Sequence, residues 1–327
     1  MTQADLVRAT IAGEATPRPA YSFWTHFPGT DLDPEAIARE TVAFTRATRA
    51  DFVKSMPNGL YVVEDWGVRA DFSEIAKGGV AKVTESPIAT AADWARVQRL
   101  DPTAGALGRE LRHLRLVVEA LGPDVPVLAT VFSPVTIAKK LAGGAGFARH
   151  AADHRAAVQD ALTVMADTTA AFSRAAIALG CAGVFFAVQD ATSETGEDAY
   201  RADYLAHDIA ALNGARGGWF NAVHMHGDDI LFDVLKDLPL PVLNWHIGET
   251  SPSIAEYRKA GGAKAVLGGL RRMPITQGNM AAIEDDLAAI HAANGGCGVL
   301  ISPGCVIRHP VDTAVLQRIA ARIRGEA

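Results

Sequence analysis

The stretch from residue 183 to residue 190 reads Gly-Val-Phe-Phe-Ala-Val-Gln-Asp, an apolar run that ends at two polar side chains. A short, uncharged run of this kind predicts a strand that is covered on both of its faces. Strands of that type belong to parallel sheets with helices packed on the sheet. The stretch therefore predicts an α/β fold, with Gln189 and Asp190 at the carboxyl end of one strand.

The same pattern of an apolar run followed by a helical stretch recurs eight times along the chain. The predicted strands are Ala20–His26, Asp51–Lys54 with a continuation at Leu60–Val63, Pro126–Phe132, Gly183–Val188, Trp219–His224, Pro241–His246, Ala263–Leu267 and Gly298–Ser302. Eight such units are the number that closes a (β/α)8 barrel. A doubly wound sheet is the alternative, but no Gly-x-Gly-x-x-Gly follows a strand and no Walker A motif occurs.

The length of 327 residues fits one barrel with an N-terminal extension. No break in composition divides the chain, so we expect a single domain over residues 1–327. The stretch Tyr61–Ala92 is irregular and predicts an insertion after the second strand. Asp33 followed by Pro34 predicts a helix start, apolar spacing predicts a long helical region over residues 147–179, and Ser251-Pro252 predicts a further start.

Composition and charge narrow the class of protein. A net charge of −6 argues against nucleic acid as a partner, because phosphate binding needs clustered Lys and Arg. Three cysteines cannot form a disulfide framework and fit a reducing compartment. No uncharged apolar run is long enough to span a membrane. We therefore expect a soluble, cytoplasmic enzyme that acts on a small molecule.

One histidine pair and one cysteine stand at the predicted strand ends, where barrel enzymes carry their chemistry. His224 ends the fifth strand, and His226 follows two residues later, so both side chains point to the same side of an extended chain. Cys305 follows the last strand, whereas Cys181 and Cys297 precede strands. Two imidazoles and a thiol suit zinc. The alternative is a polar site in which the same histidines move protons.

Further polar residues follow the other strands. His246 and Glu249 are candidates for a fourth metal ligand or a catalytic group. Asp190 either accepts a hydrogen bond from the substrate or caps the following helix. Arg271 lies after the seventh strand, where many barrels bind anions. The candidate substrate-binding residues are Gln189, Asn244, Trp245, Arg271, Lys54 and His26.

At these strand ends the sequence resembles the uroporphyrinogen decarboxylase superfamily. The resemblance is carried by Phe186–Asp190, His224–Gly227, Val242–Trp245, Gly268–Leu270 and Ser302–Cys305. It covers most of the chain and implies a (β/α)8 barrel. The superfamily includes uroporphyrinogen decarboxylases and zinc-dependent methyltransferases linked to corrinoids or coenzyme M.

Two segments place the chain nearer to the methyltransferase branch. The decarboxylases carry an arginine-rich N-terminal segment, whereas residues 21–29 here contain no arginine. They also end the last strand in Gly-His-Gly, where this chain has Pro303-Gly304-Cys305. The methyltransferases carry His-x-Cys and a distant Cys, which His224 and Cys305 match, with His226 in place of the middle Cys.

The resemblance implies a zinc-dependent methyl-transfer enzyme whose metal is held by His224, His226 and Cys305. A corrinoid would reach it only on a partner protein, because the chain has no corrinoid-binding Asp-x-His-x-x-Gly segment. A homodimer is expected by analogy. The alternatives are a metal-free lyase that decarboxylates a carboxylic acid or a porphyrinogen, and a non-catalytic barrel that binds a corrinoid or tetrapyrrole carrier.

Overall fold

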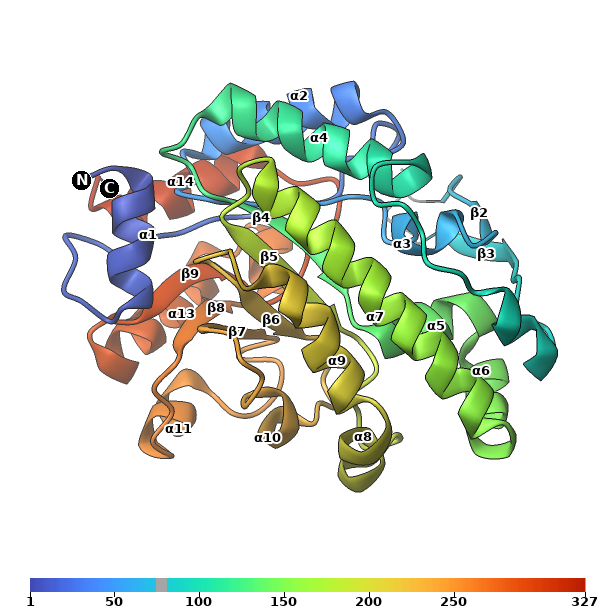
Figure 1. Cartoon of the computed structure of the whole chain (residues 1–327). Helices are drawn as coiled ribbons and strands as arrows, with labels where there is room; N and C mark the ends of the chain where they lie inside the picture. The colour runs from blue at the N-terminus through green and yellow to red at the C-terminus, as the bar shows by residue number, and fades with distance from the viewer. Residues whose placement is uncertain (75–80, 327) are drawn as a thin grey trace.

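The computed structural model describes residues 1–74 and 81–326, and within them a parallel seven-stranded sheet forms the centre (Figure 1). The strands follow chain order across the sheet, β1-β4-β5-β6-β7-β8-β9. They are β1 Val53–Lys54, β4 Val127–Phe132, β5 Gly183–Val188, β6 Ala222–Met225, β7 Val242–Trp245, β8 Ala265–Leu270 and β9 Val299–Pro303. The α/β class and seven of the eight predicted strands are confirmed.

Helices lie around the outside of the central strands (Figure 1). They are α1 Gln3–Ile11, α2 Pro34–Thr48, α3 Tyr61–Glu64, α4 Gly105–Leu121, α5 Pro134–Ala142, α6 Gly144–Asp153, α7 Arg155–Ala178, α8 Glu197–Asp203, α9 Leu205–Leu212, α10 Phe232–Leu235, α11 Ile254–Lys259, α12 Arg272–Gln277, α13 Met280–Asn294 and α14 Thr313–Arg324, with 3-10 turns η2 Ala91–Arg96 and η3 Asn213–Ala215. The helix start at Pro34 is confirmed, because the Asp33 side chain accepts hydrogen bonds from two backbone amides of the first turn. Among the described residues, no helix is both long and apolar enough to cross a lipid bilayer.

The two faces of the curled sheet bury two separate apolar clusters. Val223 and Met225 of β6 pack outward against the helices, in the larger cluster. Ala222 belongs to the inner cluster, which also includes Leu6 and Val7 of α1. Because strand side chains alternate between faces, the inner face at the carboxyl end of β6 belongs to residue 224. The period of two thus directs a histidine into the interior of the sheet.

The segment Ala20–His26 is not a continuous strand, which corrects the prediction at this position. It makes isolated parallel bridges from Tyr21 to Ile301 and from Thr25 to Ile307. The bridge points are four positions apart on the segment but six positions apart on the partner chain, from Ile301 in β9 to Ile307 beyond it. The two extra residues lie where the chain bends at Gly304 and Cys305, directly after β9, so a regular ladder cannot form.

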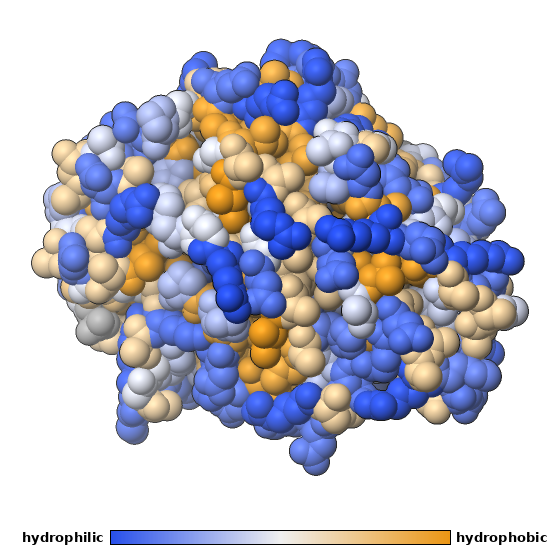
Figure 2. Space-filling model, in the orientation of Figure 1, coloured by the Kyte–Doolittle hydropathy of each residue, from blue (hydrophilic) through white to orange (hydrophobic). Residues whose placement is uncertain are grey.

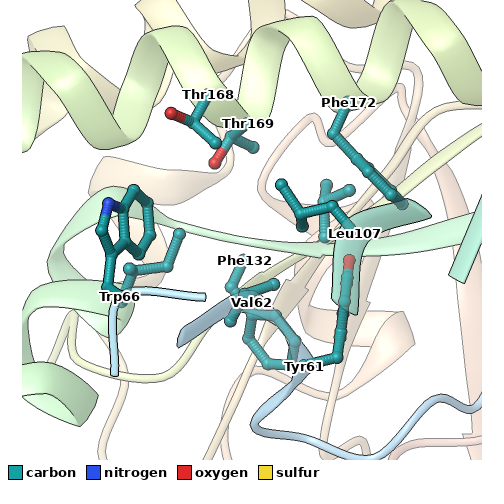
Figure 3. A pocket seen from close by; sticks show the side chains of 10 residues that line it. Tyr61, Val62, Trp66, Leu107, Phe132, Thr168, Thr169 and Phe172 are labelled. Carbon is teal, nitrogen blue, oxygen red and sulfur yellow. The ribbon is translucent and has the colours of Figure 1, made fainter. Parts of the chain in front are cut away.

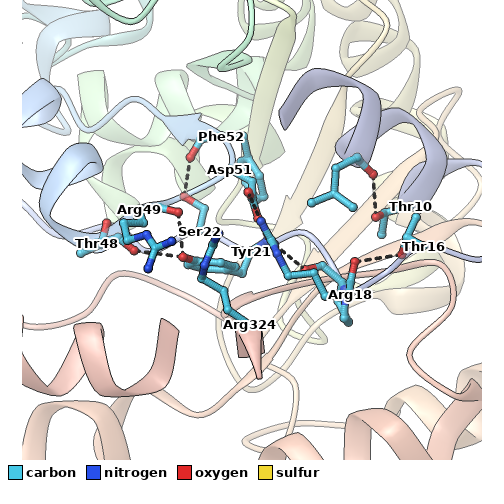
Figure 4. Close-up of polar contacts among 12 residues, drawn as sticks. Thr10, Thr16, Arg18, Tyr21, Ser22, Thr48, Arg49, Asp51, Phe52 and Arg324 are labelled. Carbon is cyan, nitrogen blue, oxygen red and sulfur yellow. Dashed lines mark hydrogen bonds and ion pairs between the residues drawn. The ribbon is translucent and has the colours of Figure 1, made fainter. Parts of the chain in front are cut away.

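Side-chain contacts hold this segment against the start of β1 (Figure 4). Arg18 forms an ion pair with the buried Asp51 at 2.6 Å. The Tyr21 amide donates to the same carboxylate, and the Ser22 hydroxyl donates to the Phe52 carbonyl at 2.6 Å. The segment therefore lies between the two edge strands, β9 and β1, although it is not itself a strand.

Two other predicted elements differ from those in the structure. Leu60–Val63 is not a strand continuation but overlaps helix α3, because the Asn58 side chain accepts the Leu60 amide and turns the chain. The helical region predicted over 147–179 is interrupted at His154, which separates α6 from α7. The insertion contains α3 and a short antiparallel pair, β2 Arg69–Asp71 and β3 Lys82–Glu85. Its residues 75–80 lie outside the described part of the chain.

Tight packing fills the layer between β4 and the long helix α7 (Figure 3). Tyr61, Phe132 and Phe172 surround a cavity of only about 10 Å³ there. A space of that size barely holds one water molecule, so this layer contributes stability. Figure 2 shows hydrophilic side chains spread over this side of the molecule with apolar ones between them, as on ordinary protein surfaces.

Candidate metal centre

Three histidines and one cysteine converge at the carboxyl ends of the strands. His224 lies in β6, His226 follows it, His246 follows β7 and Cys305 follows β9. Each offers one ligand atom, and all four atoms lie within 4.8 Å of one another. His224, His246 and Cys305 are buried, and His226 is half-buried. The sequence predicts these residues at the ends of three strands, and the sheet brings them to one point.

The spacing of three donor atoms matches the spacing of zinc ligands. His224 Nε2 lies 3.3 Å from His226 Nδ1, and Cys305 Sγ lies 3.7 Å from His226 Nδ1 and 3.9 Å from His224 Nε2. A tetrahedral zinc with bonds of about 2.0 Å to nitrogen and 2.3 Å to sulfur separates two nitrogen ligands by about 3.3 Å, and a nitrogen from a sulfur ligand by about 3.5 Å. The donor set therefore fits zinc in both chemistry and separation.

Asn244 fixes the orientation and the proton of His224. Its amide nitrogen donates to the Leu267 carbonyl at 2.7 Å, so its oxygen faces His224 Nδ1 at 2.5 Å. An oxygen partner requires that Nδ1 carry the proton, which leaves the Nε2 lone pair free. Such an outer hydrogen bond is the usual support of a metal-binding histidine. Phe185 stacks on the same imidazole, with 5.2 Å between ring centroids.

His246 is held by a different set of partners. Its Nε2 accepts the backbone amide of Gly227 at 3.3 Å, and its Nδ1 lies 3.7 Å from a Glu249 carboxylate oxygen. Glu249 also pairs with Arg272 at 3.0 Å. Glu249 thus contacts the His246 ring but does not belong to the group of four donors. His246 is the fourth member of that group.

Burial keeps the imidazoles neutral. It lowers the pKa of His224 well below the ordinary value, and neighbouring histidines act in the same direction. The pKa of His226 is lowered, first by burial and then by Arg272 and Lys140. Burial also lowers the pKa of His246, to about 4, and raises the pKa of the Cys305 thiol. Neutral imidazoles have lone pairs for a cation, and a coordinated thiol loses its proton.

A cavity of about 130 Å³ opens beside the cluster. His224, His226 and Cys305 line it, together with three residues predicted to bind substrate, namely Lys54, His26 and Gln189. Its other lining side chains are mainly apolar or aromatic. The pKa of His26 is lowered to about 4, first by burial and then by Lys54 and His309. Burial lowers the pKa of Lys54 to about 8.

Three predicted site residues lie elsewhere or have other partners. The Trp245 side chain points outward, where its indole nitrogen donates to the Pro252 carbonyl at 2.8 Å. Arg271 forms an ion pair with Asp286 at 2.7 Å. Asp190 pairs with Lys139 at 3.1 Å. No described helix begins directly after Asp190, since the next one starts at residue 197, so the capping alternative is wrong.

Two basic residues at the site were not predicted. Lys140 of α5 lines the cavity. Arg272 forms an ion pair with Glu249, which in turn contacts His246 of the cluster. Arg272 stands next to Arg271, which the sequence analysis did select. The sequence alone does not tell which of the two adjacent arginines faces the strand ends. Lys140 lies on helix α5, so a search limited to the strand ends does not find it.

A parallel α/β sheet with three imidazoles and a thiol at its carboxyl edge defines an α/β protein with a candidate transition-metal centre. The chain belongs to the uroporphyrinogen decarboxylase family, whose model matches residues 20–325. A comparison with curated proteins finds no match.

Solved structures share the fold. A methyltransferase from Methanosarcina mazei superimposes with a TM-score of 0.80 at 16% identity, over 100% of this chain and 99% of that one. A B12-independent methionine synthase from a Shewanella species, in complex with selenomethionine, superimposes with a TM-score of 0.57 at 12% identity, over 98% and 97% of the two chains. At such low identity these likenesses establish the fold alone.

Proposed function

We propose that this protein is a zinc-dependent methyl-transfer enzyme that acts on a small substrate in the cavity beside the cluster. The observation that carries the proposal is the separation of three donor atoms, at 3.3, 3.7 and 3.9 Å, which suits tetrahedral zinc. Membership of the uroporphyrinogen decarboxylase family and the fold shared with a methyltransferase support it.

In this proposal His224, His226 and Cys305 hold the metal, and His246 either completes the set or orients the substrate beside it. When bound, zinc supplies the Lewis acidity that favours the thiolate form of a substrate thiol. Asn244 keeps the His224 lone pair available, and Glu249 steadies His246. Gln189 and His26 line the cavity and contact the substrate.

The proposal treats residues 1–327 as one (β/α)8 barrel domain, in which the bridged segment at residues 20–26 takes the place of the eighth strand. The methyl group would come from a corrinoid protein or a methylated small molecule. The chain would act as a homodimer, as the family resemblance implies.

Metal analysis tests this proposal. We expect purified protein to hold about one zinc per chain, and Cys305→Ser to lose most of it. Cys181→Ser is the matched control, because Cys181 is buried outside the cluster and should leave the zinc content unchanged. Less than about a tenth of an equivalent of zinc in the parent protein, or equal zinc in both variants, would refute the metal site.

A metal-free carboxy-lyase is the second candidate, favoured by one observation: two half-buried lysines, Lys54 and Lys140, line the cavity and could receive a carboxylate. Carbon dioxide release from an acid that continues after exhaustive chelation would favour it over methyl transfer.

A further inference from the structure

We propose that Gly304 is a positioning residue of the candidate metal centre. Only a residue without a side chain at this point lets the segment that carries Cys305 reach the segment that carries His246. The inference deepens the proposed function, on which it rests, by naming a residue that brings two donors together. Gly304 is not one of the four donors, and it lies directly before Cys305.

His246 and Cys305 follow strands that are not neighbours in the sheet. The order is β7-β8-β9, so β8 separates the strand before His246 from the strand before Cys305. Adjacent strands lie about 4.8 Å apart, and two strands with a third between them lie about twice as far apart. The donor atoms of His246 and Cys305 nevertheless lie within 4.8 Å of each other. The two segments close this gap over the carboxyl end of β8.

The contact between the two segments is made by the backbone at Gly304. Its amide donates to the carbonyl of Leu270, the last residue of β8, at 3.2 Å. A Cβ added to Gly304 would lie 2.8 Å from the Trp245 carbonyl oxygen and 3.0 Å from His246 Cα. Non-bonded carbon atoms normally pack at about 3.5–4.0 Å. Because both obstructing atoms belong to the backbone, no side-chain rotation relieves this collision, and one of the two segments has to move.

Strand β8 also leaves room for the segment after β7. Gly268 of β8 has a φ of 151°, and a Cβ there would lie 2.7 Å from Ile247 Cδ1 and 3.8 Å from Asn244 Nδ2. The same Asn244 nitrogen donates to the Leu267 carbonyl at 2.7 Å. Residues 244–247 are therefore held between two positions without side chains, one on β8 and the other at Gly304.

A side chain at position 304 would widen the centre. Relieving the contact with His246 Cα alone, from 3.0 Å to about 3.5 Å, needs a shift of about 0.5 Å. Cys305 is the next residue, so this shift alters the separation of its thiol from His246 and from His226, which is 3.7 Å from it. Functional groups have to be held within about 0.5 Å of their working geometry, so the shift is large enough to matter.

Gly304→Ala tests the proposal, and Gly218→Ala is the matched control. A Cβ on Gly218 would lie 2.7 Å from Gly183 Cα and 3.0 Å from the Ala182 carbonyl oxygen, at the opposite, amino end of the strands. Competition with a chromogenic chelator should show zinc binding weakened about tenfold or more in Gly304→Ala and unchanged in Gly218→Ala. In cobalt-loaded protein, Gly304→Ala should weaken the visible absorption of the tetrahedral site, which a loss of stability alone does not do.

Thiol labelling of chelator-treated protein separates this inference from the proposed function. Cys305 is buried, and after displacement it should react about tenfold faster with iodoacetamide in Gly304→Ala than in the parent, as measured by peptide-resolved mass spectrometry. Cys181, buried outside the cluster, should stay protected and so shows that the variant is folded. Faster labelling of Cys305 would support the positioning role even if the parent bound no zinc and the zinc proposal had failed.

Zinc affinity, cobalt absorption and Cys305 labelling that all equal those of the parent would overturn the proposal, as would equal losses in Gly304→Ala and Gly218→Ala. If Cys181 labelling shows that Gly304→Ala does not fold, Gly268→Ala takes its place. It displaces residues 244–247 from the other side, through the flexible Ile247 side chain. Gly268→Ala should bind zinc more weakly than Gly218→Ala, and equal binding in these two variants would refute the positioning role.

Discussion

Two buried polar clusters lie near the carboxyl ends of the strands, and they differ in the length of their polar contacts and in whether they border a cavity. In the first, Asp208 accepts hydrogen bonds from the Ser133 hydroxyl at 2.5 Å and the Tyr200 hydroxyl at 2.6 Å, one at each carboxyl oxygen. In the second, His224 and His226 direct ring nitrogens at each other and at Cys305. Neither Asp208 nor its two partners line the cavity, whereas these three do.

The difference shows that a shifted pKa alone does not identify a functional site. Burial raises the pKa of Asp208 to about 7, and burial likewise lowers the pKa of His224. Both are the ordinary result of removing a charge from water. What separates the clusters is that the first closes on one carboxylate through short hydrogen bonds, whereas the second brings ring nitrogens and a thiol together at 3.3 to 3.9 Å beside a cavity. The first stabilises the fold, and the second is suited to a ligand.

The largest expected effect is on metal binding after loss of His224. We expect His224→Ala to lower zinc affinity by more than about a hundredfold, because a direct ligand contributes more than the 10- to 100-fold typical of its supporting residues. Competition with a chromogenic chelator measures it. His291→Ala, on the exposed side of α13, is the control. Retained affinity in His224→Ala would place the metal elsewhere and remove the contrast between the clusters.

A smaller loss is expected when the support of His224 is removed. Asn244→Leu should weaken zinc binding about 10- to 100-fold. The reason is that His224 Nδ1 loses its hydrogen-bond acceptor, and the imidazole ring is then no longer held in one tautomer. Asn221→Leu is the matched control. Asn221 is also buried and accepts the Val184 amide, so its loss should lower stability while zinc affinity stays unchanged. Equal zinc affinity in Asn244→Leu and the parent would show that Asn244 is only structural.

The order of the sheet and the histidine pair follow from local patterns. The apolar run at Gly183–Val188 forms a strand with the predicted bounds. His224 and His226 lie on one side because strand side chains alternate. Parallel strands also bring residues far apart in sequence to one edge, which is why Cys305 meets His226. These inferences need only the period of each strand and the common direction of the strands.

Features that depend on tertiary geometry were not predictable in the same way. The break between Tyr21 and Thr25 arises from a bend in the neighbouring chain, which the segment's own apolar pattern does not encode. The Asp208 cluster joins residues from two helices and a strand end, and none of its members has a distinctive spacing. The cationic character of the cavity depends on Lys140, whose helix must first be placed beside β4 and β5.

The smallest expected effect concerns the closed cluster and depends on pH. The unfolded chain loses the Asp208 proton near its ordinary pKa of 3.8, but the folded protein holds it up to about pH 7. The stability from this group is therefore fully present below about pH 4 and is lost as the pH rises to about 7. Asp208→Asn lacks this loss because its side chain stays neutral. Its stability relative to the parent should rise by about 1 kcal/mol per pH unit between pH 5 and 7.

Urea unfolding of the metal-free protein at pH 5, 6 and 7 measures this difference. Asp198→Asn, on the exposed surface of α8, is the control and should show no comparable pH dependence. Zinc affinity of Asp208→Asn at neutral pH should equal that of the parent, because the closed cluster shares no atom with the cavity wall. A zinc affinity that falls with Asp208→Asn would mean that the two clusters are coupled. Short hydrogen bonds that close on one carboxylate would then not separate a structural cluster from a ligand site in this fold.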